Sequence, residues 1–303
     1  MKIYVIVVAY NGLKYYDDCF LSLRASSYPV DIIVVDNAST DGTNAYIKEH
    51  FPDVKLIEST ENLGFGKGNN IGLRYAMEHN CDFVFLLNQD AYVESETIET
   101  LVRCSLEHPE YAILSPMHVY PDKMHINMSL SDGDVNLSLL SEGYYEGLYN
   151  LKDRVFDMSY INAAAWLLPR KTLDIIGGFC PLFRHYFEDD DYINRVKYHN
   201  LKIGLVPGIR IVHNTSKPES HKRKLLDMAM NEGLYEYLNI NREINFRKRK
   251  FTFWKNYMRA ILKKDSESMK ENWVKYQYLK RNLSEILICR ELNKMRGPHY
   301  LYD

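Results

Sequence analysis

The segment Ile32-Ile33-Val34-Val35-Asp36-Asn37 joins four consecutive apolar residues to two polar ones. A continuous apolar run of this length is typical of a strand buried on both faces, as in a parallel sheet covered by helices. In the first half of the chain, β-branched runs alternate with amphipathic stretches. The runs lie at residues 2–9, 31–36, 54–58 and 83–87, and the amphipathic stretches at 15–25, 43–50, 67–80 and 95–108. This alternation predicts an α/β fold, Rossmann-like, with a mostly parallel central sheet and helices on both faces.

Polar residues follow each of the four expected strands. These segments are Tyr10-Asn11, Asp36-Asn37, the glycine-rich stretch 62–72 and Asn88-Gln89-Asp90. In open α/β sheets, ligands bind beyond the carboxyl ends of the strands. We therefore expect the four segments to meet at one rim of the sheet and to form a ligand site there.

Two of these segments suggest a nucleotide. The carboxylate of Asp36 at a strand end suits the N3–H of a pyrimidine or the hydroxyls of a ribose, whereas residues 39–43 suit helix capping. In the glycine-rich stretch, Asn62, Gly66 and Asn69 precede or enter a helix, where backbone N–H groups approach phosphates closely. A flexible turn is the alternative. The spacing matches neither a P-loop nor the dinucleotide fingerprint.

The segment Asn88-Gln89-Asp90 is the candidate metal site. Mg²⁺ and Mn²⁺ are held by one or two carboxylates together with phosphate oxygens of the substrate. Asp90 supplies one carboxylate, and Asn88 lies near enough to contact a ribose or a metal-bound water. The alternative is a turn that the Asn and Asp side chains stabilise.

Taken together and in this order, the four segments resemble family 2 glycosyltransferases of the GT-A fold, and especially rhamnosyltransferase-like bacterial enzymes of surface-polysaccharide synthesis. The resemblance extends from about residue 2 to about residue 216. It implies a UDP- or dTDP-sugar donor and a divalent metal. It places the base at Asp36, the ribose at Asn88, the metal at Asp90, and other parts of the nucleotide at Ala9, Tyr10, Asn11, Asn62, Gly66, Asn69 and Gln89. The family's usual Asp-x-Asp is Asn-Gln-Asp here, which implies weaker metal binding.

An acidic run, Glu188-Asp189-Asp190-Asp191, begins another expected helix. The helix N-terminus stabilises ionised carboxylates, whereas neighbouring like charges raise their pKa values. The run alone leaves open which carboxylate serves as a base, or whether the run is a solvated helix start. The resemblance implies that Asp189 is the catalytic base, that Glu188 orients the acceptor, and that His213 reaches the metal or the diphosphate.

Trp166 follows three alanines at positions 163–165. Small residues beside an aromatic ring would let an acceptor sugar stack on the indole face. Packing of Trp166 in the core is the alternative.

The charge of the chain becomes basic after residue 216. Residues 217–303 contain 20 Lys and Arg against 11 Asp and Glu, although the whole chain has a net charge of −2. We expect a catalytic domain at residues 1–216 and a basic, aromatic-rich helical region at 217–303, with helices near 225–238, 251–262 and 268–295.

Residues 246–255 interleave cations with aromatics, which is typical of a helix at an anionic membrane surface. The alternative is inward packing of the aromatics. The acidic remainder argues against nucleic acid.

The apolar runs and the cysteines indicate the compartment of the protein and the redox state of its thiols. No apolar run approaches the roughly 18 residues that span a bilayer. The run at residues 1–9 continues into Tyr10-Asn11-Gly12 without a cleavage site, so we expect a first strand rather than a signal peptide. The five cysteines form no CxxC pair and are expected to be reduced. These features predict a cytoplasmic protein, at the inner face of the membrane if its acceptor is lipid-linked.

The sequence therefore predicts an inverting, metal-dependent glycosyltransferase that acts on a hydroxyl of a glycan or lipid-linked glycan. One alternative is a sugar-1-phosphate nucleotidylyltransferase, but its phosphate loop would follow the first strand, where Tyr10-Asn11-Gly12-Leu13 stands. Another is a non-catalytic nucleotide- or glycan-binding scaffold. The presence of Glu188, Asp189 and His213 argues against it. The sequence leaves the oligomeric state undefined.

Overall fold

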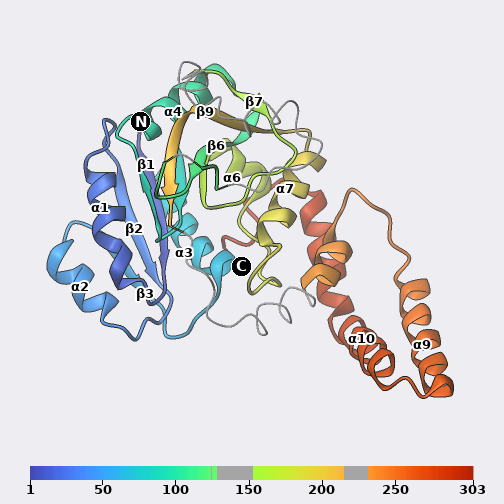
Figure 1. Ribbon diagram of the computed structural model, residues 1–303. Helices are drawn as coiled ribbons and strands as arrows, with labels where there is room; N and C mark the ends of the chain where they lie inside the picture. The colour runs from blue at the N-terminus through green and yellow to red at the C-terminus, as the bar shows by residue number, and fades with distance from the viewer. Residues whose placement is uncertain (124, 128–152, 215–230, 303) are drawn as a thin grey trace.

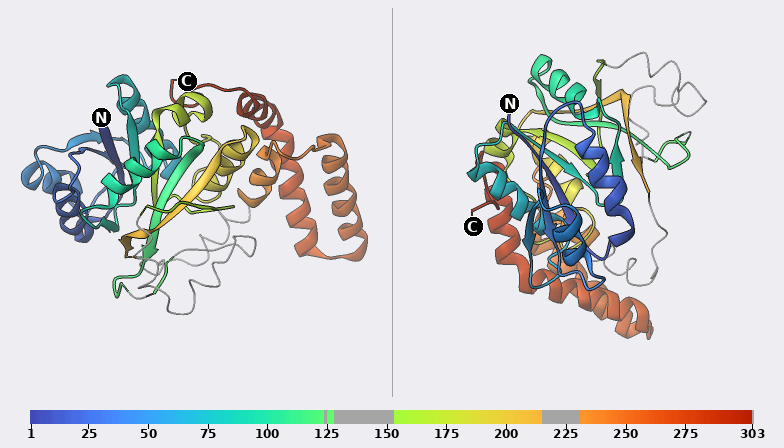
Figure 2. Two further views of the ribbon diagram at one scale, coloured as in Figure 1. Left: turned by 90° about the horizontal axis from the view of Figure 1, so that it is seen from above. Right: turned by 90° about the vertical axis from the view of Figure 1, so that its left-hand side faces the viewer.

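The computed structural model describes residues 1–123, 125–127, 153–214 and 231–302 (Figure 1). One mixed sheet runs through the molecule in the order β3-β2-β1-β4-β8-β6-β9-β5, and β7 pairs with β9. Helices cover both faces of the sheet, so the expected α/β fold class is confirmed. A helical C-terminal region projects from one side, also as expected (Figures 1 and 2).

The N-terminal half of the sheet is parallel throughout. Its strands are β1 (Ile3–Ala9), β2 (Asp31–Asp36), β3 (Lys55–Glu58) and β4 (Phe83–Leu87). Ala9 pairs with Asp36, and Asp36 pairs with Glu58. Three strands therefore end at the same level, and the loops that follow them lie at one rim, as the sequence predicts.

The helices divide between two hydrophobic clusters, one on each face of the sheet. On one face lie α1 (Tyr16–Arg24), α2 (Thr43–His50) and α4 (Thr97–Glu107). On the other lie α3 (Phe65–Glu78), α6 (Arg170–Ile176) and α7 (Glu188–Tyr198). Burial on both faces explains why the central strands are almost wholly apolar.

The second half of the sheet departs from a parallel pattern. Its strands are β5 (Ala91–Val93), β6 (Tyr111–Val119), β7 (Phe156–Asp157), β8 (Ala165–Pro169) and β9 (Lys202–His213). The strand β8 is antiparallel to β4, and β5 is antiparallel to β9. No pattern in the sequence predicted β6.

The strand β9 continues through Pro207-Gly208, a pair that is typical of a turn. Its register against β6 shifts between Val206 and Arg210, which pair with the consecutive residues Pro116 and Met117. Pairing continues on both sides of this irregularity, so Pro207-Gly208 bends the strand without ending it.

Two glycines bring α3 unusually close to β1. A Cβ atom on Gly72 would lie 2.6 Å from Cγ2 of Ile6, and one on Gly68 would lie 2.9 Å from Cγ1 of Val8. The glycine-rich sequence therefore has a packing function as well as a loop function, because only a helix without side chains at these positions fits against β1.

The C-terminal region consists of helical residues 231–238, α9 (Phe246–Lys263) and α10 (Ser266–Lys294). The helices α9 and α10 form an arm that extends away from the sheet (Figures 1 and 2). The expected boundary at residue 216 lies outside the described residues, so the division into two domains stays a prediction. None of the described helices is both long and apolar enough to cross a bilayer.

The base of this arm is held first by the preceding C-terminal segment and then by the main core. The guanidinium of Arg290 donates hydrogen bonds to the carbonyls of Tyr237, Asn239 and Arg242 at 2.7–2.8 Å. The chain then returns to the main core, where Leu301 is buried and the N–H of Gly178 donates to the carbonyl of His299 at 2.8 Å. The C-terminal end of α10 therefore belongs to the body of the molecule.

The contact between α3 and β1 can be tested with Gly72→Ala. The added methyl group has no room beside Ile6, so this change should lower the free energy of unfolding by about 1–3 kcal/mol in urea denaturation. Gly233→Ala is the matched control, because the nearest side-chain atom to its Cβ would be 3.8 Å away. In a helix, this control should be neutral or stabilising by up to about 1 kcal/mol. Equal effects of the two changes would contradict the close packing.

Candidate functional site

The loops after β1 and β2 are joined by hydrogen bonds that fix Asp36. Both carboxylate oxygens of this buried residue accept from the N–H of Ser39 at 3.2 Å. The N–H of Asn11 donates to Oγ of Ser39 at 3.0 Å, and Oδ1 of Asn11 accepts from the N–H of Thr40 at 2.8 Å. Asp36 and Asn11 therefore occupy one pre-formed turn at the rim.

Gln89 holds the end of β1. Its Oε1 accepts from the N–H of Tyr10 at 2.9 Å, and its Nε2 donates to the carbonyl of Tyr10 at 3.1 Å. A Cβ on Gly12 would lie 2.3 Å from Oε1 of Gln89, so a side chain there would displace the Gln89 amide. The Gln89 amide is thus engaged with the backbone, and we infer that it positions Tyr10. Ala9 is fully buried within β1.

Asn37, which the sequence analysis did not single out, holds the glycine-rich loop. Its Oδ1 accepts from the N–H of Leu63 at 2.9 Å, and its Nδ2 donates to the carbonyl of Gly64 at 3.0 Å. Its position directly after Asp36, at the end of a strand, is the sequence feature that could have indicated this role.

Asn62, Gly66 and Asn69 also shape the loop and the first turn of α3. Oδ1 of Asn62 accepts from the N–H of Gly64 at 3.0 Å, and Nδ2 of Asn69 donates to the carbonyl of Phe65 at 3.0 Å. A Cβ on Gly66 would lie 3.0 Å from Cβ of Phe179 and 3.6 Å from Cβ of Glu188. The glycine-rich loop therefore lies beside the acidic helix start, and the open N–H groups of the first turn of α3 face the same region.

The structure brings Asp90 and His213 together. Pairing of β5 with β9 sets Ala91 opposite His213, and Nε2 of His213 then lies 3.4 Å from Oδ1 of Asp90. Nε2 is also 3.3 Å from Nδ2 of Asn88. His213 is mostly buried, and its Nδ1 has no hydrogen-bond partner among the described residues. The Asp90 carboxylate suits Mg²⁺ or Mn²⁺ whose other ligands are phosphate oxygens and water, whereas the His213 imidazole favours a transition metal such as Mn²⁺.

Two observations bear on this candidate metal site. Within the described ranges, no three His, Cys, Asp or Glu side chains gather as a metal-binding group. A metal ion there would therefore also need substrate oxygens as ligands, in keeping with Asn88 in place of a second acid. The ring of His118 lies edge-on to His213 with centroids 6.2 Å apart, and burial lowers the pKa of His118 to about 3. This neutral neighbour adds no positive charge to the site.

The carboxylates of α7 have different environments. Asp191 forms a buried ion pair with Arg195, with Oδ2 and Nε 3.0 Å apart. This pairing removes Asp191 from the candidates for the base. Oδ2 of Asp189 accepts from the hydroxyl of Tyr160 at 2.9 Å, and Asp189 is partly exposed. Tyr160 is a further site residue that the sequence did not indicate.

Glu188 is buried, and its Oε2 has no hydrogen-bond partner among the described residues. Burial, with a smaller contribution from the charge of Asp189, raises the pKa of Glu188 to about 8. Burial and the same neighbour raise the pKa of Asp190 to about 7. Near neutral pH, Glu188 therefore carries a proton that it can donate in a hydrogen bond.

The two residues that precede α7 have a strained backbone conformation. Tyr186 and Phe187 both have positive φ angles, 69° and 70°, which are unfavourable for residues with a side chain. The ring of Phe187 packs against Tyr235 with centroids 5.6 Å apart, and the side chain of Asn231 donates to the carbonyl of His185. The C-terminal helical region therefore supports the loop that positions Glu188 and Asp189.

The expectation that Trp166 stacks on an acceptor sugar is wrong. The residue has 0% exposure, and its ring packs against Phe179 and Tyr192 with centroids 6.2 and 5.7 Å away. It lies on β8, between β4 and β6 in the sheet, where both faces are covered by helices. Trp166 is a core residue.

The raised pKa of Glu188 predicts how stability depends on pH. Between its ordinary value of 4.5 and about 8, the folded protein retains a proton that the unfolded chain releases. Stability should therefore fall as pH rises through this interval. Glu188→Gln keeps the shape without the charge and should flatten the fall, measured by urea denaturation at a series of pH values. Glu49→Gln, an exposed control on α2, should keep the wild-type slope. Identical slopes for all three proteins would refute the burial argument.

Comparison with known proteins adds the family. The model of glycosyl transferase family 2 matches residues 4–189. The chain is 24% identical over 217 residues to the dTDP-rhamnosyl transferase RfbF of Shigella flexneri, covering 70% of this chain and 69% of that protein. It is also 24% identical over 245 residues to the N-acetylglucosaminyl-diphospho-decaprenol L-rhamnosyltransferase of Mycobacterium tuberculosis, covering 72% and 79%.

A third relative is the low-salt glycan biosynthesis hexosyltransferase Agl10 of Haloferax volcanii, 24% identical over 186 residues. That match covers 61% of this chain but only 59% of Agl10, less than two thirds of its length.

Solved structures support the fold. Staphylococcus aureus TarS 1–349 in complex with UDP-GlcNAc matches with a TM-score of 0.56 at 19% identity, covering 97% of this chain and 89% of that one. GalNAc-T7 with UDP, GalNAc and Mn²⁺ also gives a TM-score of 0.56, at 13% identity, covering 78% and 50%. The family match covers more than half of the chain and favours glycosyl transfer over nucleotidylyl transfer. The protein therefore belongs to glycosyl transferase family 2.

Proposed function

We propose that this protein transfers a sugar from a UDP- or dTDP-sugar to a hydroxyl of a glycan or lipid-linked glycan, with inversion at the anomeric carbon. The observation that supports this most is the Asp90–His213 pair, 3.4 Å apart at the rim that also holds Asp36. The names of RfbF and the TarS complex suggest dTDP- and UDP-linked donors respectively.

The donor would bind along the carboxyl ends of β1 and β2. Asp36 would accept hydrogen bonds from the base, and the turn that Asn11 holds would surround the nucleoside. Asp90 and His213 would hold Mg²⁺ or Mn²⁺, with Asn88 beside the ribose. When bound, the metal supplies a positive charge that stabilises the departing diphosphate. The Mn²⁺ in the GalNAc-T7 complex agrees with such a role in this fold.

Asp189 would act as the base in a single displacement. Its carboxylate takes the proton of the acceptor hydroxyl, the acceptor oxygen bonds to the anomeric carbon, and the bond from that carbon to the diphosphate oxygen breaks. The hydroxyl of Tyr160 orients the carboxylate through Oδ2. Glu188, protonated near neutral pH, would position the acceptor by donating a hydrogen bond. Attack opposite the leaving group inverts the anomeric centre.

The acceptor class rests on the relatives. The mycobacterial relative is named for a decaprenol-linked substrate. We propose a lipid-linked glycan as the acceptor, and hence a cytoplasmic protein that works at the inner face of a membrane.

Replacing the base tests this proposal. Asp189→Asn should lower kcat about a hundredfold to ten-thousandfold, which is the usual contribution of a general base. The measurement is release of the nucleoside diphosphate from a panel of UDP- and dTDP-sugars with a glycan acceptor, in Mn²⁺, in Mg²⁺ or with a chelator.

Asp190→Asn is the matched control, because it removes the adjacent carboxylate of the same helix turn and leaves the contact between Tyr160 and Asp189 in place. It should retain most of the activity. Full activity of Asp189→Asn would exclude this residue as the base, and no release from any donor would count against transfer itself.

A further inference from the structure

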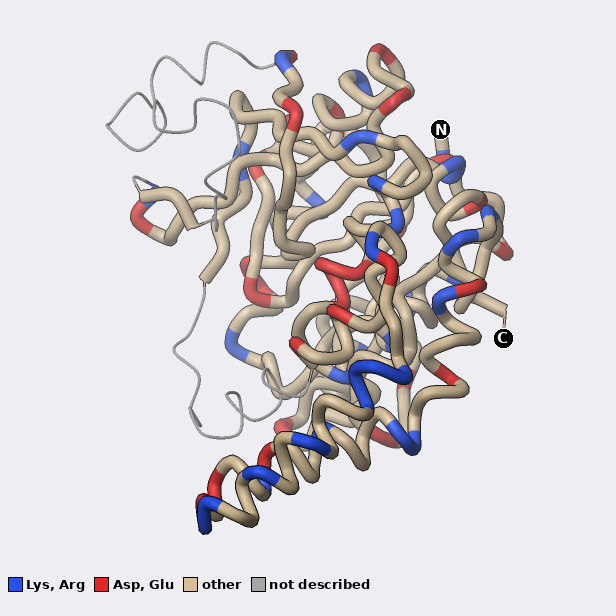
Figure 3. The backbone as a smooth tube through the Cα atoms, turned by 90° about the vertical axis from the view of Figure 1, so that its right-hand side faces the viewer, with Lys and Arg blue, Asp and Glu red and all other residues tan. Residues whose placement is uncertain are grey.

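The helix α9 is strongly basic along its whole length. Its 18 residues, FRKRKFTFWKNYMRAILK, contain seven Lys and Arg and no Asp or Glu. Arg249 forms an ion pair with Glu236. No ion pair joins the other six cations of α9 to a carboxylate among the residues that the structure describes. The tube in Figure 3 shows basic residues spaced along the projecting arm.

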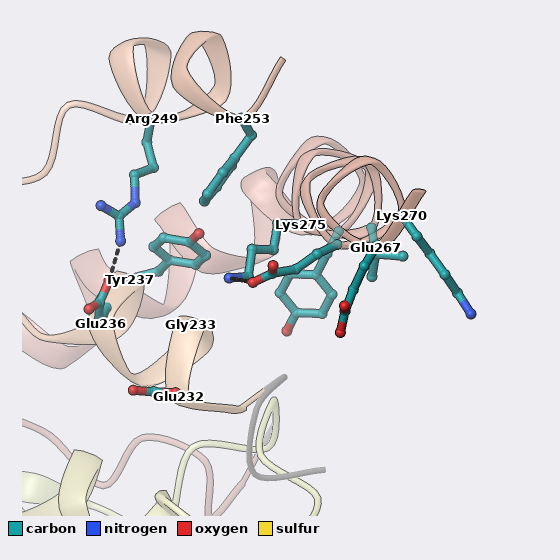
Figure 4. Close-up of a pocket in the computed structure, with 12 residues that line it drawn as sticks. Glu232, Gly233, Glu236, Tyr237, Arg249, Phe253, Glu267, Lys270 and Lys275 are labelled. Atoms are coloured by element: carbon teal, nitrogen blue, oxygen red, sulfur yellow. Dashed lines mark hydrogen bonds and ion pairs between the residues drawn. The ribbon is translucent and has the colours of Figure 1, made fainter. Parts of the chain in front are cut away.

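One face of α9 packs on its neighbours. Arg249 and Phe253 point toward the helical residues 231–238, and together with residues of α10 they line a cavity of about 650 Å³ (Figure 4). The ring of Tyr257 packs at an angle against Trp273 of α10 with centroids 4.9 Å apart, and Ala260 is buried. The contacts of α9 with the rest of the protein therefore use this inner face.

The outer face of α9 carries a second apolar stripe. It consists of Phe251, Trp254, Met258, Ile261 and Leu262, each between 41% and 82% exposed. The intervals of three and four residues place them on one side of the helix. The rings of Phe251 and Trp254 lie 6.0 Å apart and form an aromatic pair on the surface. An exposed group of large apolar side chains of this kind indicates a binding surface.

Cations border this outer stripe. Lys248, Lys255 and Arg259 repeat at helical intervals along one edge, and Lys250 lies on the other. Apolar residues in the middle and cations at the edges match an anionic bilayer surface, where the stripe enters the acyl boundary and the cations meet the headgroups. We propose that the outer face of α9 docks on a membrane rich in anionic phospholipid.

Two other partners fit this surface less well. A second copy meeting α9 against α9 would bring seven cations toward seven cations with no carboxylate on either helix to compensate. Nucleic acid would satisfy the cations but would leave Met258, Ile261 and Leu262 against a charged backbone.

This docking deepens the proposed function, because a membrane-bound enzyme would meet a lipid-linked acceptor at the surface. Only the biological role of the docking rests on the proposed sugar transfer, and the docking itself does not. Binding to vesicles needs neither donor nor acceptor, so vesicle binding and sugar transfer can fail independently.

Cosedimentation of the full chain with vesicles tests the proposal. The wild type should bind vesicles that contain phosphatidylglycerol, bind phosphatidylcholine vesicles weakly, and detach at high salt. The double variant Trp254→Ser with Leu262→Ser should bind at least about tenfold more weakly, because it removes two apolar side chains from the stripe. Its matched control is Leu106→Ser, which removes a similarly exposed leucine from α4 and should bind like the wild type.

Charge is tested separately with Lys255→Gln and Arg259→Gln. Each change should weaken binding to phosphatidylglycerol vesicles about fivefold. Arg74→Gln, an exposed site on α3, is the control and should have no effect. Both the stripe variant and the charge variants alter exposed side chains, so their thermal unfolding should match the wild type and confirm intact folding.

Two results would overturn the proposal. The first is absence of binding to phosphatidylglycerol vesicles, and the second is unchanged binding of the Trp254→Ser, Leu262→Ser variant. If vesicle binding is absent, a dimer in light scattering that this variant dissociates would assign the stripe to a second copy of the chain.

Discussion

In-register parallel pairing of β1 with β2 is the constraint on which the site depends. Because Ala9 lies opposite Asp36, the two following loops begin at the same level and exchange hydrogen bonds through Asn11 and Ser39. Side-chain amides then extend this arrangement, with Asn37 holding the glycine-rich loop and Gln89 holding Tyr10. The rim is thus built before any ligand arrives, which is how a binding site keeps its polar groups aimed at the substrate.

The sequence predicted the parallel half of the fold well, because apolar runs followed by polar residues are a local pattern. It did not predict β6 or the unbroken β9, since both depend on pairing with distant strands. The meeting of Asp90 with His213 also comes from such pairing, of β5 with β9, and was expected only through the family resemblance. The prediction that Trp166 binds a sugar was wrong because the three alanines before it are equally compatible with a buried strand.

The C-terminal region has two separate consequences. Its helix at residues 231–238 packs against the loop before α7, where Tyr186 and Phe187 adopt positive φ angles and set the direction of the acidic helix. Composition alone indicated a basic, aromatic segment but not which rings face inward. The structure separates Phe253, which lines the cavity beside α10, from Trp254, which is exposed on the outer face.

The proposed reaction is a direct displacement at this rim, with Asp189 as the base and the diphosphate leaving from the opposite side. The anomeric configuration of the product can be determined by NMR after transfer from a donor of known configuration. A direct displacement gives a product with the opposite configuration to the donor. A product that retains the donor's configuration would contradict it, because a single displacement cannot retain the anomeric centre.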